Sequence, residues 1–313
     1  MGSDFLRYDP GFLLDCYQDE RPPLGPGLPY VELKRFSPAD CPIIKRFDEP
    51  FRPTGHDKHV YEEFVRQGRV DPGRDERAVR LADYDVASGT FLVQRCAYSD
   101  GIRSNYAMDY ASERGISLRN KMAAQYGRRL PPLSDARLAN AVGTAVIVFY
   151  RGEDHAMLPY LPMRAKRSAV FASGGYHCTA SGETLWQESA RTFDELFTRH
   201  ICLELEEEVG LTREHLAWIY PVSLCREMLR GGKPQLFFAA CTEANAAELT
   251  RLRRAAIERQ IARGRQEVED DMLGACDPEE LCTIEARTNL TLARDFLKTK
   301  ELDEDPVHRA IGQ

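Results

Sequence analysis

The chain has 313 residues, 43% of them hydrophobic, which is enough apolar material for the core of one large or two small globular domains. Its formal net charge of −7 comes from interspersed acidic and basic residues, so the composition indicates neither nucleic acid nor an anionic membrane as a partner. No apolar run approaches the roughly 18 residues of a membrane span, and the first residues lack a basic-then-apolar secretory pattern. These features predict a cytoplasmic protein.

The nine cysteines are scattered and include no C-x-x-C pair. An odd number of scattered cysteines, several of them in apolar contexts, is typical of buried free thiols in a reducing compartment. Zinc sites need clusters of ligands, and the sequence shows no such cluster. Cys178 differs from the other cysteines, because it lies close to a glycine pair that borders the predicted site.

Residues 1–88 are rich in proline and charge. Two stretches with proline and glycine, at 21–27 and 51–55, interrupt any regular element. We expect an irregular N-terminal arm with short helices at 61–67 and 77–81. The arm either wraps over the following domain or forms a homodimer contact.

The strand signal improves after this arm. A strand at 90–98 and a helix at 117–125 form a predicted subdomain over residues 89–138. The near-continuous apolar run at 142–150 is typical of a strand that is covered on both faces.

This apolar strand opens the largest predicted domain, residues 139–300. A strand at 156–163 pairs with it, and residues 169–172 lead into the glycine pair. After the acidic stretch we expect strands at 216–225 and 236–241, joined by a flap-like connection at 226–234. Two helices follow, at 243–268 and 290–300. A tail at 301–313 completes the chain.

The stretch at 195–211, most of it a predicted helix, carries the most informative residues. The helix starts with a capping box formed by Thr192 and Glu195, and its last residue is followed by Gly210, where a left-handed conformation is favoured. Three acids stand at positions i, i+3 and i+4 on one face, namely Glu204, Glu207 and Glu208. Carboxylates this close resist ionising together, so either one keeps its proton or divalent cations lie between them.

These residues resemble the signature of the Nudix hydrolases, G-x5-E-x7-R-E-U-x-E-E-x-G-U, in which U is a bulky aliphatic residue. The second half of the signature matches from Glu204 to Leu211, and its first acid falls on Glu195 by spacing. Two positions depart from the signature. Leu203 stands at the arginine position, and Ser189 stands at the position of the first glycine.

The segment around Gly174-Gly175 and Gly182-Glu183 resembles the GG...GE loop of the same family. Glu183 therefore competes with Glu195 for the role of the first acid. The layout of residues 90–285, with a long insertion between this loop and the acidic helix, is most similar to the Nudix proteins that hydrolyse UDP-glucose. The resemblance implies an α/β fold, a Nudix α/β/α sandwich with a mixed sheet, together with an N-terminal α+β extension.

The resemblance also implies Mg2+-dependent hydrolysis of the pyrophosphate bond in a nucleoside diphosphate linked to another group, for example a nucleotide sugar. Glu204, Glu207 and Glu208 would hold Mg2+ or Mn2+, which prefer oxygen ligands, and Glu195 would act with them in catalysis. The general base stays open among several acids. The expected substrate contacts are Gly174, Gly175, Arg164, Arg167, His177 and Arg226.

The missing arginine leaves other interpretations open. In the family this arginine orients the acids, so Leu203 is also consistent with a catalytically idle Nudix fold that serves as a nucleotide sensor or an interaction module. In a third interpretation Arg199 replaces the missing arginine. That interpretation requires the Arg199 side chain to turn toward the acids and away from solvent.

Overall fold

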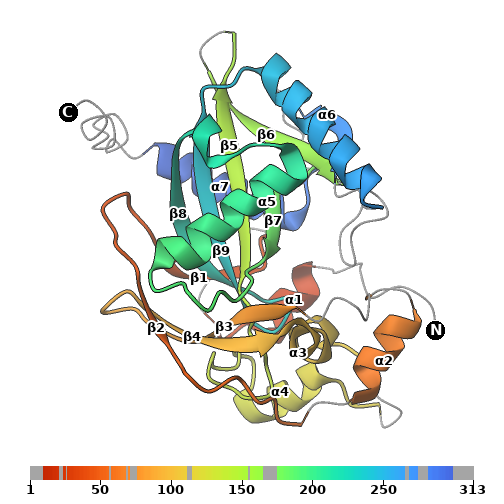
Figure 1. Cartoon of the computed structure of the whole chain (residues 1–313). Coiled ribbons are helices and arrows are strands. Elements are labelled where there is room, and N and C mark those ends of the chain that lie inside the picture. Colours follow the sequence, from red (N-terminus) through yellow and green to blue (C-terminus); the bar gives the residue numbers. More distant parts are fainter. Residues whose placement is uncertain are drawn as a thin grey trace.

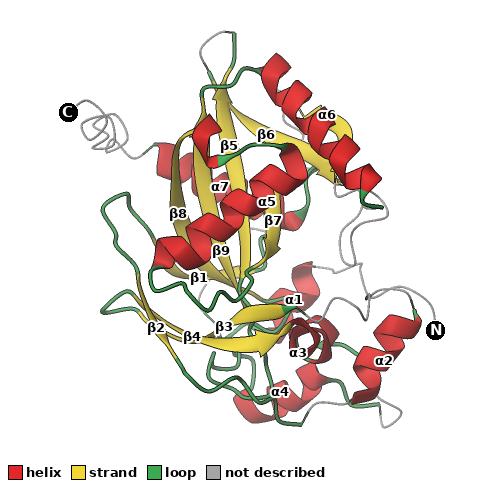
Figure 2. Cartoon of the chain, in the orientation of Figure 1, coloured by secondary structure: helices red, strands yellow, loops and turns green. Residues whose placement is uncertain are grey.

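The computed structural model describes residues 10–20, 24–25, 27–55, 58–67, 70, 76–110, 115–153, 156–164, 175–264, 268–273 and 281–298 (Figures 1 and 2). These residues form one large sheet, one small sheet and a set of helices packed against them.

The larger sheet has the strand order β1-β8-β9-β5-β6-β10, and β7 pairs with the first half of β5. β5 and β9 run parallel, whereas the other neighbours run antiparallel, so the sheet is mixed as predicted. The strands are β1 Tyr30–Arg35, β5 Gly143–Arg151, β6 Met157–Arg164, β7 Ala180–Glu183, β8 Leu216–Glu227, β9 Lys233–Thr242 and β10 Val268–Leu273.

Helices cover both faces of this sheet. In Figure 1, α5 (Arg199–Val209) and α6 (Ala246–Ala262) lie in front of the strands, and α7 (Ile284–Leu297) lies behind them. β5 is buried along its length except at its last residue, because alternate side chains enter two different cores. Val146 shares a core with residues of α5, and Ile147 shares one with residues of α7. The α/β/α sandwich is confirmed.

The inner face of the acidic helix fixes its position on the sheet. Four apolar side chains at four-residue spacing are fully buried there, namely Phe197, Ile201, Leu205 and Val209. Burying each such side chain contributes about 1.5–3 kcal/mol. The opposite face, which carries the acids, is therefore held in a defined orientation.

The N-terminal α+β extension is confirmed as a three-stranded sheet in the order β2-β4-β3 with four helices. Its elements, in chain order, are α1 Pro10–Cys16, β2 Ile43–Arg46, α2 Lys58–Arg66, β3 Arg77–Asp85, β4 Thr90–Ala97, α3 Tyr98–Arg103 and α4 Leu118–Tyr126. The predicted strand at 90–98 and helix at 117–125 correspond to β4 and α4.

The prediction that residues 1–88 are irregular is wrong. β1 belongs to the larger sheet, and the predicted helix at 77–81 lies within β3. The backbone of β3 pairs with β4 and bridges to Ala141 and Leu185, and these distant partners override the local helical pattern. The predicted boundary at residue 88 falls in the turn between β3 and β4.

The C-terminal elements begin and end at other residues than predicted. The helix expected at 243–268 ends at Ala262, and the strand β10, which was not predicted, follows it and pairs with β6. α7 begins before the predicted residue 290, because the Thr283 hydroxyl accepts a hydrogen bond from Ala286 N and caps the helix there. The segments 169–172 and 301–313 lie outside the described residues.

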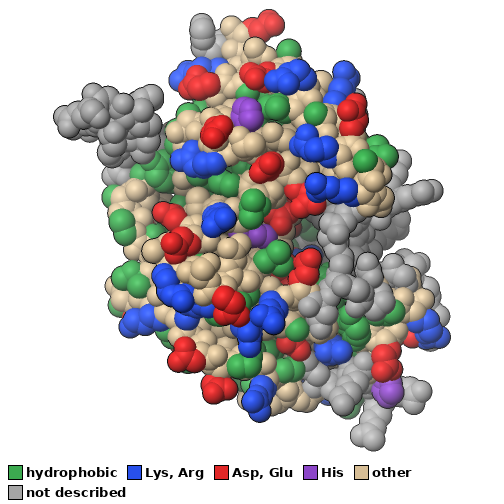
Figure 3. Space-filling model, viewed as in Figure 1, with side chains coloured by type: hydrophobic (Ala, Val, Ile, Leu, Met, Phe, Trp, Pro, Cys, Tyr) green, Lys and Arg blue, Asp and Glu red, His purple; other side chains and the backbone are tan. Residues whose placement is uncertain are grey.

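The surface agrees with the composition. On the face shown in Figure 3, acidic and basic side chains are interspersed and form no large patch of one sign. Among the described residues, no helix combines the length and the apolar character that a membrane crossing requires.

Candidate functional site

The acidic helix has the two ends that its sequence predicts. Glu195 Oε2 accepts hydrogen bonds from the backbone N of Arg191 (2.6 Å) and Thr192 (3.1 Å), and Glu195 N donates to Thr192 Oγ1 (3.2 Å). These backbone donors hold the pKa of Glu195 below its usual value. At the other end, Gly210 has φ +77°, and a Cβ there would lie 2.6 Å from the carbonyl oxygen of Leu252 on α6.

Glu195 is thus engaged as a cap, and we expect its catalytic contribution to be small. Glu195→Gln should retain hydrolytic activity within about threefold, because glutamine also completes a capping box. The check is the steady-state rate with the preferred substrate and Mg2+. A loss as large as that of the α5 acids discussed below would restore Glu195 to the catalytic set.

Two acids of α5 face the same short stretch of β7. Glu208 is 9% exposed, and its Oε1 accepts a hydrogen bond from Ser181 N at 3.2 Å. Glu204 packs on the next residue, since a Cβ added to Gly182 would lie 2.6 Å from the Glu204 carboxyl carbon. The two carboxylates, one helical turn apart, therefore border one edge of β7.

Glu207 is exposed on the same helix. Within the described part of the chain, the three acids do not form a cluster whose ligand oxygens all lie within 4.8 Å of one another. The expectation that all three side chains meet is wrong for this structure, because the Ser181 amide holds Glu208 toward β7 while Glu207 points outward.

Because Gly182 has no side chain, the Glu204 carboxylate can lie directly against β7. A side chain at position 182 should therefore lower the rate of hydrolysis. Gly182→Ala should lower the rate about 10- to 100-fold, because a displacement near 1 Å of a catalytic group can cost about that much. The displaced group is the end of a flexible side chain, so the variant should fold. Gly25→Ala is the control, since its added Cβ would make only an ordinary contact, 3.7 Å from Leu28 Cδ1. Equal rates for the two variants would contradict the placement of Glu204.

His200 lies one turn before Glu204 on α5. Its side chain is buried, with Nε2 3.5 Å from Glu204 Oε1. Burial lowers the pKa of His200 to about 4, because a charged imidazolium loses its hydration there. The imidazole is therefore neutral near pH 7, and its contact with Glu204 is not an ion pair at that pH.

The buried neutral histidine predicts a loss of stability in mild acid. Between the ordinary pKa of 6.5 and the folded value of about 4, the unfolded chain binds a proton that the folded chain does not, so the free energy of unfolding falls as pH falls. At about 1.4 kcal/mol per unit, the metal-free protein should lose about 2 kcal/mol between about pH 6.5 and about pH 5. Urea unfolding in EDTA measures this. His200→Gln should show a correspondingly smaller loss, and identical pH profiles would contradict the assignment.

The position of the missing signature arginine is open to solvent. Leu203 is 48% exposed, and Arg199, the proposed replacement, is exposed too. Among the described residues Arg199 makes no ion pair with the acids. The hypothesis that Arg199 substitutes for the arginine is therefore wrong.

The predicted substrate contacts are only partly described. Gly174 and Arg167 lie outside the described residues, and Arg164 is described only by its backbone at the end of β6. Gly175 lies in the segment before β7, so it remains a proposed contact. His177 is buried, with Nδ1 2.6 Å from Thr283 Oγ1 and Nε2 3.0 Å from Ser181 Oγ.

Arg226 has a structural environment. It is 8% exposed, its Nε donates to Gly232 O at 3.0 Å, and its Nη2 donates to Pro131 O. Burial lowers the pKa of Arg226 to about 10. These bonds brace the β8–β9 connection, which favours a role in stability over the predicted contact with substrate.

Sequence reasoning missed a group of buried charges at the end of β7 and the start of β9. Glu183 accepts a hydrogen bond from Tyr106 OH at 3.0 Å, and burial raises the pKa of the Glu183 carboxyl. Lys233 is 2% exposed, and burial lowers the pKa of its amine. Arg230 Nη1 lies 3.2 Å from Glu227 Oε2. Glu183 had a signal in the sequence as the rival first acid, and Glu227 was one of the acids left open as the general base. Lys233 and Arg230 reach this group because β8, the turn after it and β9 lie beside it.

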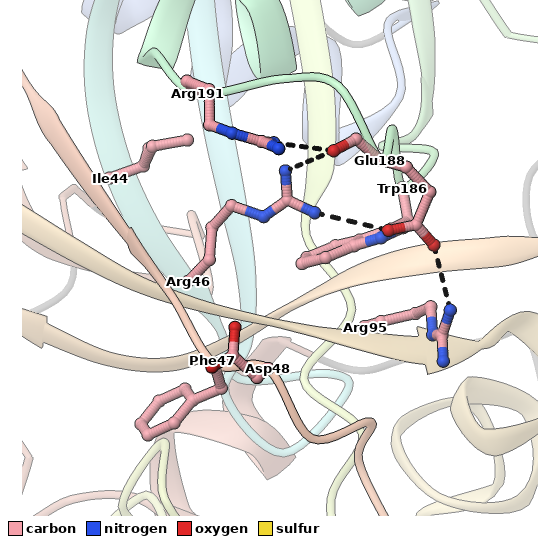
Figure 4. Close-up of a pocket in the computed structure, with 8 residues that line it drawn as sticks. All are labelled: Ile44, Arg46, Phe47, Asp48, Arg95, Trp186, Glu188 and Arg191. Carbon is pink, nitrogen blue, oxygen red and sulfur yellow. Dashed lines mark hydrogen bonds and ion pairs between the residues drawn. The ribbon is translucent and has the colours of Figure 1, made fainter.

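A separate pocket of about 500 Å³ lies between the smaller sheet and the segment that precedes α5 (Figure 4). The Arg46 guanidinium stacks 4.2 Å from the centre of the Trp186 ring, and Glu188 accepts a hydrogen bond from Arg95 at 2.9 Å. Its lining residues are Ile44, Arg46, Phe47, Asp48, Arg95, Trp186, Glu188 and Arg191. None of the acids of α5 lines it.

No family model matches the sequence, and no curated protein matches it. Among solved structures, the chain is similar to a mutT/nudix family protein from Listeria innocua, with 16% identity and a TM-score of 0.36 over 52% of this chain and 96% of that one. It is similar to the NUDIX domain of Shewanella oneidensis NrtR complexed with ADP ribose, with 14% identity and a TM-score of 0.36 over 57% and 97%. It is also similar to the C. elegans Ap4A hydrolase, with 10% identity and a TM-score of 0.31 over 50% and 98%.

Identities and TM-scores of this size add no function to the chain. The chain's own elements form an α/β/α sandwich with an N-terminal extension, and the acids on α5 lie at the positions that the sequence resemblance gave them.

Proposed function

We propose that the chain is a divalent-metal-dependent hydrolase that cleaves the pyrophosphate bond of a nucleoside diphosphate linked to another group. The observation that carries the proposal is the placement of Glu204 and Glu208, one turn apart on α5, against Ser181 and Gly182 of β7. Two carboxylates at the edge of a strand provide the hard oxygen ligands that this reaction needs.

The donor set fits Mg2+ or Mn2+. Mg2+ is bound in phosphate-processing enzymes by one or two carboxylates together with substrate phosphates and waters, so a closed protein cage is not needed. Glu204 and Glu208 are the ligands we propose, with exposed Glu207 as a third. When bound, the metal neutralises phosphate oxygens and lowers the pKa of the attacking water. The hydrogen bond from Ser181 N orients Glu208 before any ligand arrives.

A second candidate is a nucleotide-binding module without turnover. It is favoured by the solvent-exposed Leu203 at the arginine position and by the engagement of Glu195 as a cap. Both features remove groups that the signature would use for catalysis. The fold and the acids would then serve binding alone.

One assay separates the two candidates. The chain is incubated with UDP-sugars, ADP-ribose, NAD, CoA and dinucleoside polyphosphates, with Mg2+, with Mn2+ and with EDTA, and nucleoside monophosphate release is followed by chromatography. A hydrolase releases the monophosphate with metal and not with EDTA. Nucleotide binding in calorimetry without any release would favour the sensor and overturn the enzymatic proposal.

A further inference from the structure

A second group of metal-binding side chains lies behind β7, apart from the acids of α5. His177 and Cys178 precede β7, and Glu285 lies in the first turn of α7. One ligand atom from each lies within 4.8 Å of the other two. His177 and Cys178 are 3% and 1% exposed, and the Glu285 side chain is 19% exposed. We propose that these three residues form a buried site for a transition-metal ion of the zinc class.

Each of the three ligands has a partner of the kind that orients metal ligands. His177 Nδ1 lies 2.6 Å from Thr283 Oγ1, an arrangement that directs Nε2 toward Glu285 Oε2 at 4.0 Å. Metal-bound histidines almost always donate their second ring N–H to an acceptor oxygen, a role that the Thr283 hydroxyl oxygen can fill. Since Thr283 Oγ1 also accepts the capping bond of α7, its position is fixed by the helix.

The other two ligands are supported in the same way. Gln235 Nε2 donates to Glu285 Oε1 at 3.1 Å, and Asn289 Nδ2 lies 3.8 Å from Cys178 Sγ. Asn289 Oδ1 is buried and has no hydrogen-bond partner in the described part of the chain, a need that a metal-bound water would meet. Each of the three donors therefore already has a polar partner that holds it in place.

The donor types select the metal. A thiolate, an imidazole nitrogen and a carboxylate suit zinc and related ions, whereas Mg2+ prefers oxygen alone. Binding transfers the Cys178 proton to solvent, and the thiolate and carboxylate then balance the two positive charges. At His177 Nε2 the metal replaces the Ser181 hydroxyl, which lies 3.0 Å away. Three protein ligands leave a fourth position for water.

The site is distinct from the proposed magnesium site and does not rest on the proposed hydrolysis. Ser181 contacts both groups, through its hydroxyl to His177 and through its backbone N to Glu208. A metal held by His177, Cys178 and Glu285 would release the Ser181 hydroxyl and would tie the segment before β7 to α7, on the face of the sheet opposite α5. A negative metal-content assay would overturn this site without touching the proposed hydrolysis, and a lack of Mg2+-dependent turnover would overturn the hydrolysis without touching this site.

The test uses the full chain in two steps. Metal content is measured after purification without chelators, and the metal-free chain is titrated with Co2+ while the thiolate-to-Co2+ charge-transfer absorption is followed. The wild type should bind about one equivalent with this absorption, and Cys178→Ser should lose it. Cys225→Ser is the control, because Cys225 is equally buried but lies in β8.

The outcomes that overturn the proposal are a wild type that shows no charge-transfer absorption, or one whose absorption survives Cys178→Ser. Near-ultraviolet circular dichroism reports whether each variant folds. If Cys178→Ser does not fold, Glu285→Gln decides, because its amide can still accept from Gln235. That variant should weaken Co2+ binding at least about tenfold, and unchanged binding would overturn the proposal.

Discussion

Glu208→Gln is expected to lower metal-dependent hydrolysis about 100- to 1000-fold. The glutamine keeps an oxygen for the Ser181 amide, so the local structure should survive while the negative ligand is lost. A 100-fold loss corresponds to about 2.7 kcal/mol of transition-state stabilisation, a reasonable share of what a bound metal supplies. The rate is measured at saturating Mg2+, and again over a range of Mg2+ concentrations.

The matched control for this variant is Glu206→Gln. Glu206 lies on the same helix, is exposed and faces away from β7, so its substitution changes the net charge equally without touching the site. Its rate should stay within about twofold of the wild type. Similar losses in both variants would show that the charge of the helix matters and that the position of Glu208 does not.

Arg230→Met is expected to lower the free energy of unfolding by about 3–5 kcal/mol. The substitution leaves Glu227, whose side chain is 6% exposed, without the guanidinium 3.2 Å away. Removing one partner of a buried ion pair typically costs this amount, because the remaining charge loses its direct counter-ion where little water can replace it. Urea unfolding monitored by circular dichroism gives the value.

Two further variants show whether burial is the cause. Arg251→Met breaks an ion pair of the same i,i+3 spacing, Arg251 with Glu248 at 3.4 Å, whose side chains are 69% and 42% exposed. It should cost less than about 1 kcal/mol. Adding Glu227→Gln to Arg230→Met should recover part of the loss. Equal costs for the buried and the exposed pair would contradict this explanation.

Elements whose signals are local could be predicted from the sequence. β5 was predicted because its eight consecutive buried residues give a near-continuous apolar run, and α5 because its cap residues and acids all lie within one stretch. Those features follow from side-chain periodicity and from hydrogen bonds between residues three or four apart. The prediction of three converging acids was wrong because Ser181, on another element, holds Glu208.

Most of the features that were missed depend on partners far apart in the chain. β1 is a strand because β8 pairs with it, and β3, besides its hairpin with β4, bridges to Ala141 and Leu185. The His177 group was missed for the same reason. Two of its ligands are adjacent in sequence, but the third comes from α7, so no ligand spacing of a zinc motif appears.

The metal site on α5 is tested most directly by anomalous X-ray scattering from crystals soaked in Mn2+. We predict a manganese peak at coordination distance, about 2.0–2.3 Å, from carboxylate oxygens of Glu204 and Glu208, at the edge formed by Ser181 and Gly182. A map in which both carboxylates keep their contacts with β7 and no manganese lies beside them would contradict it.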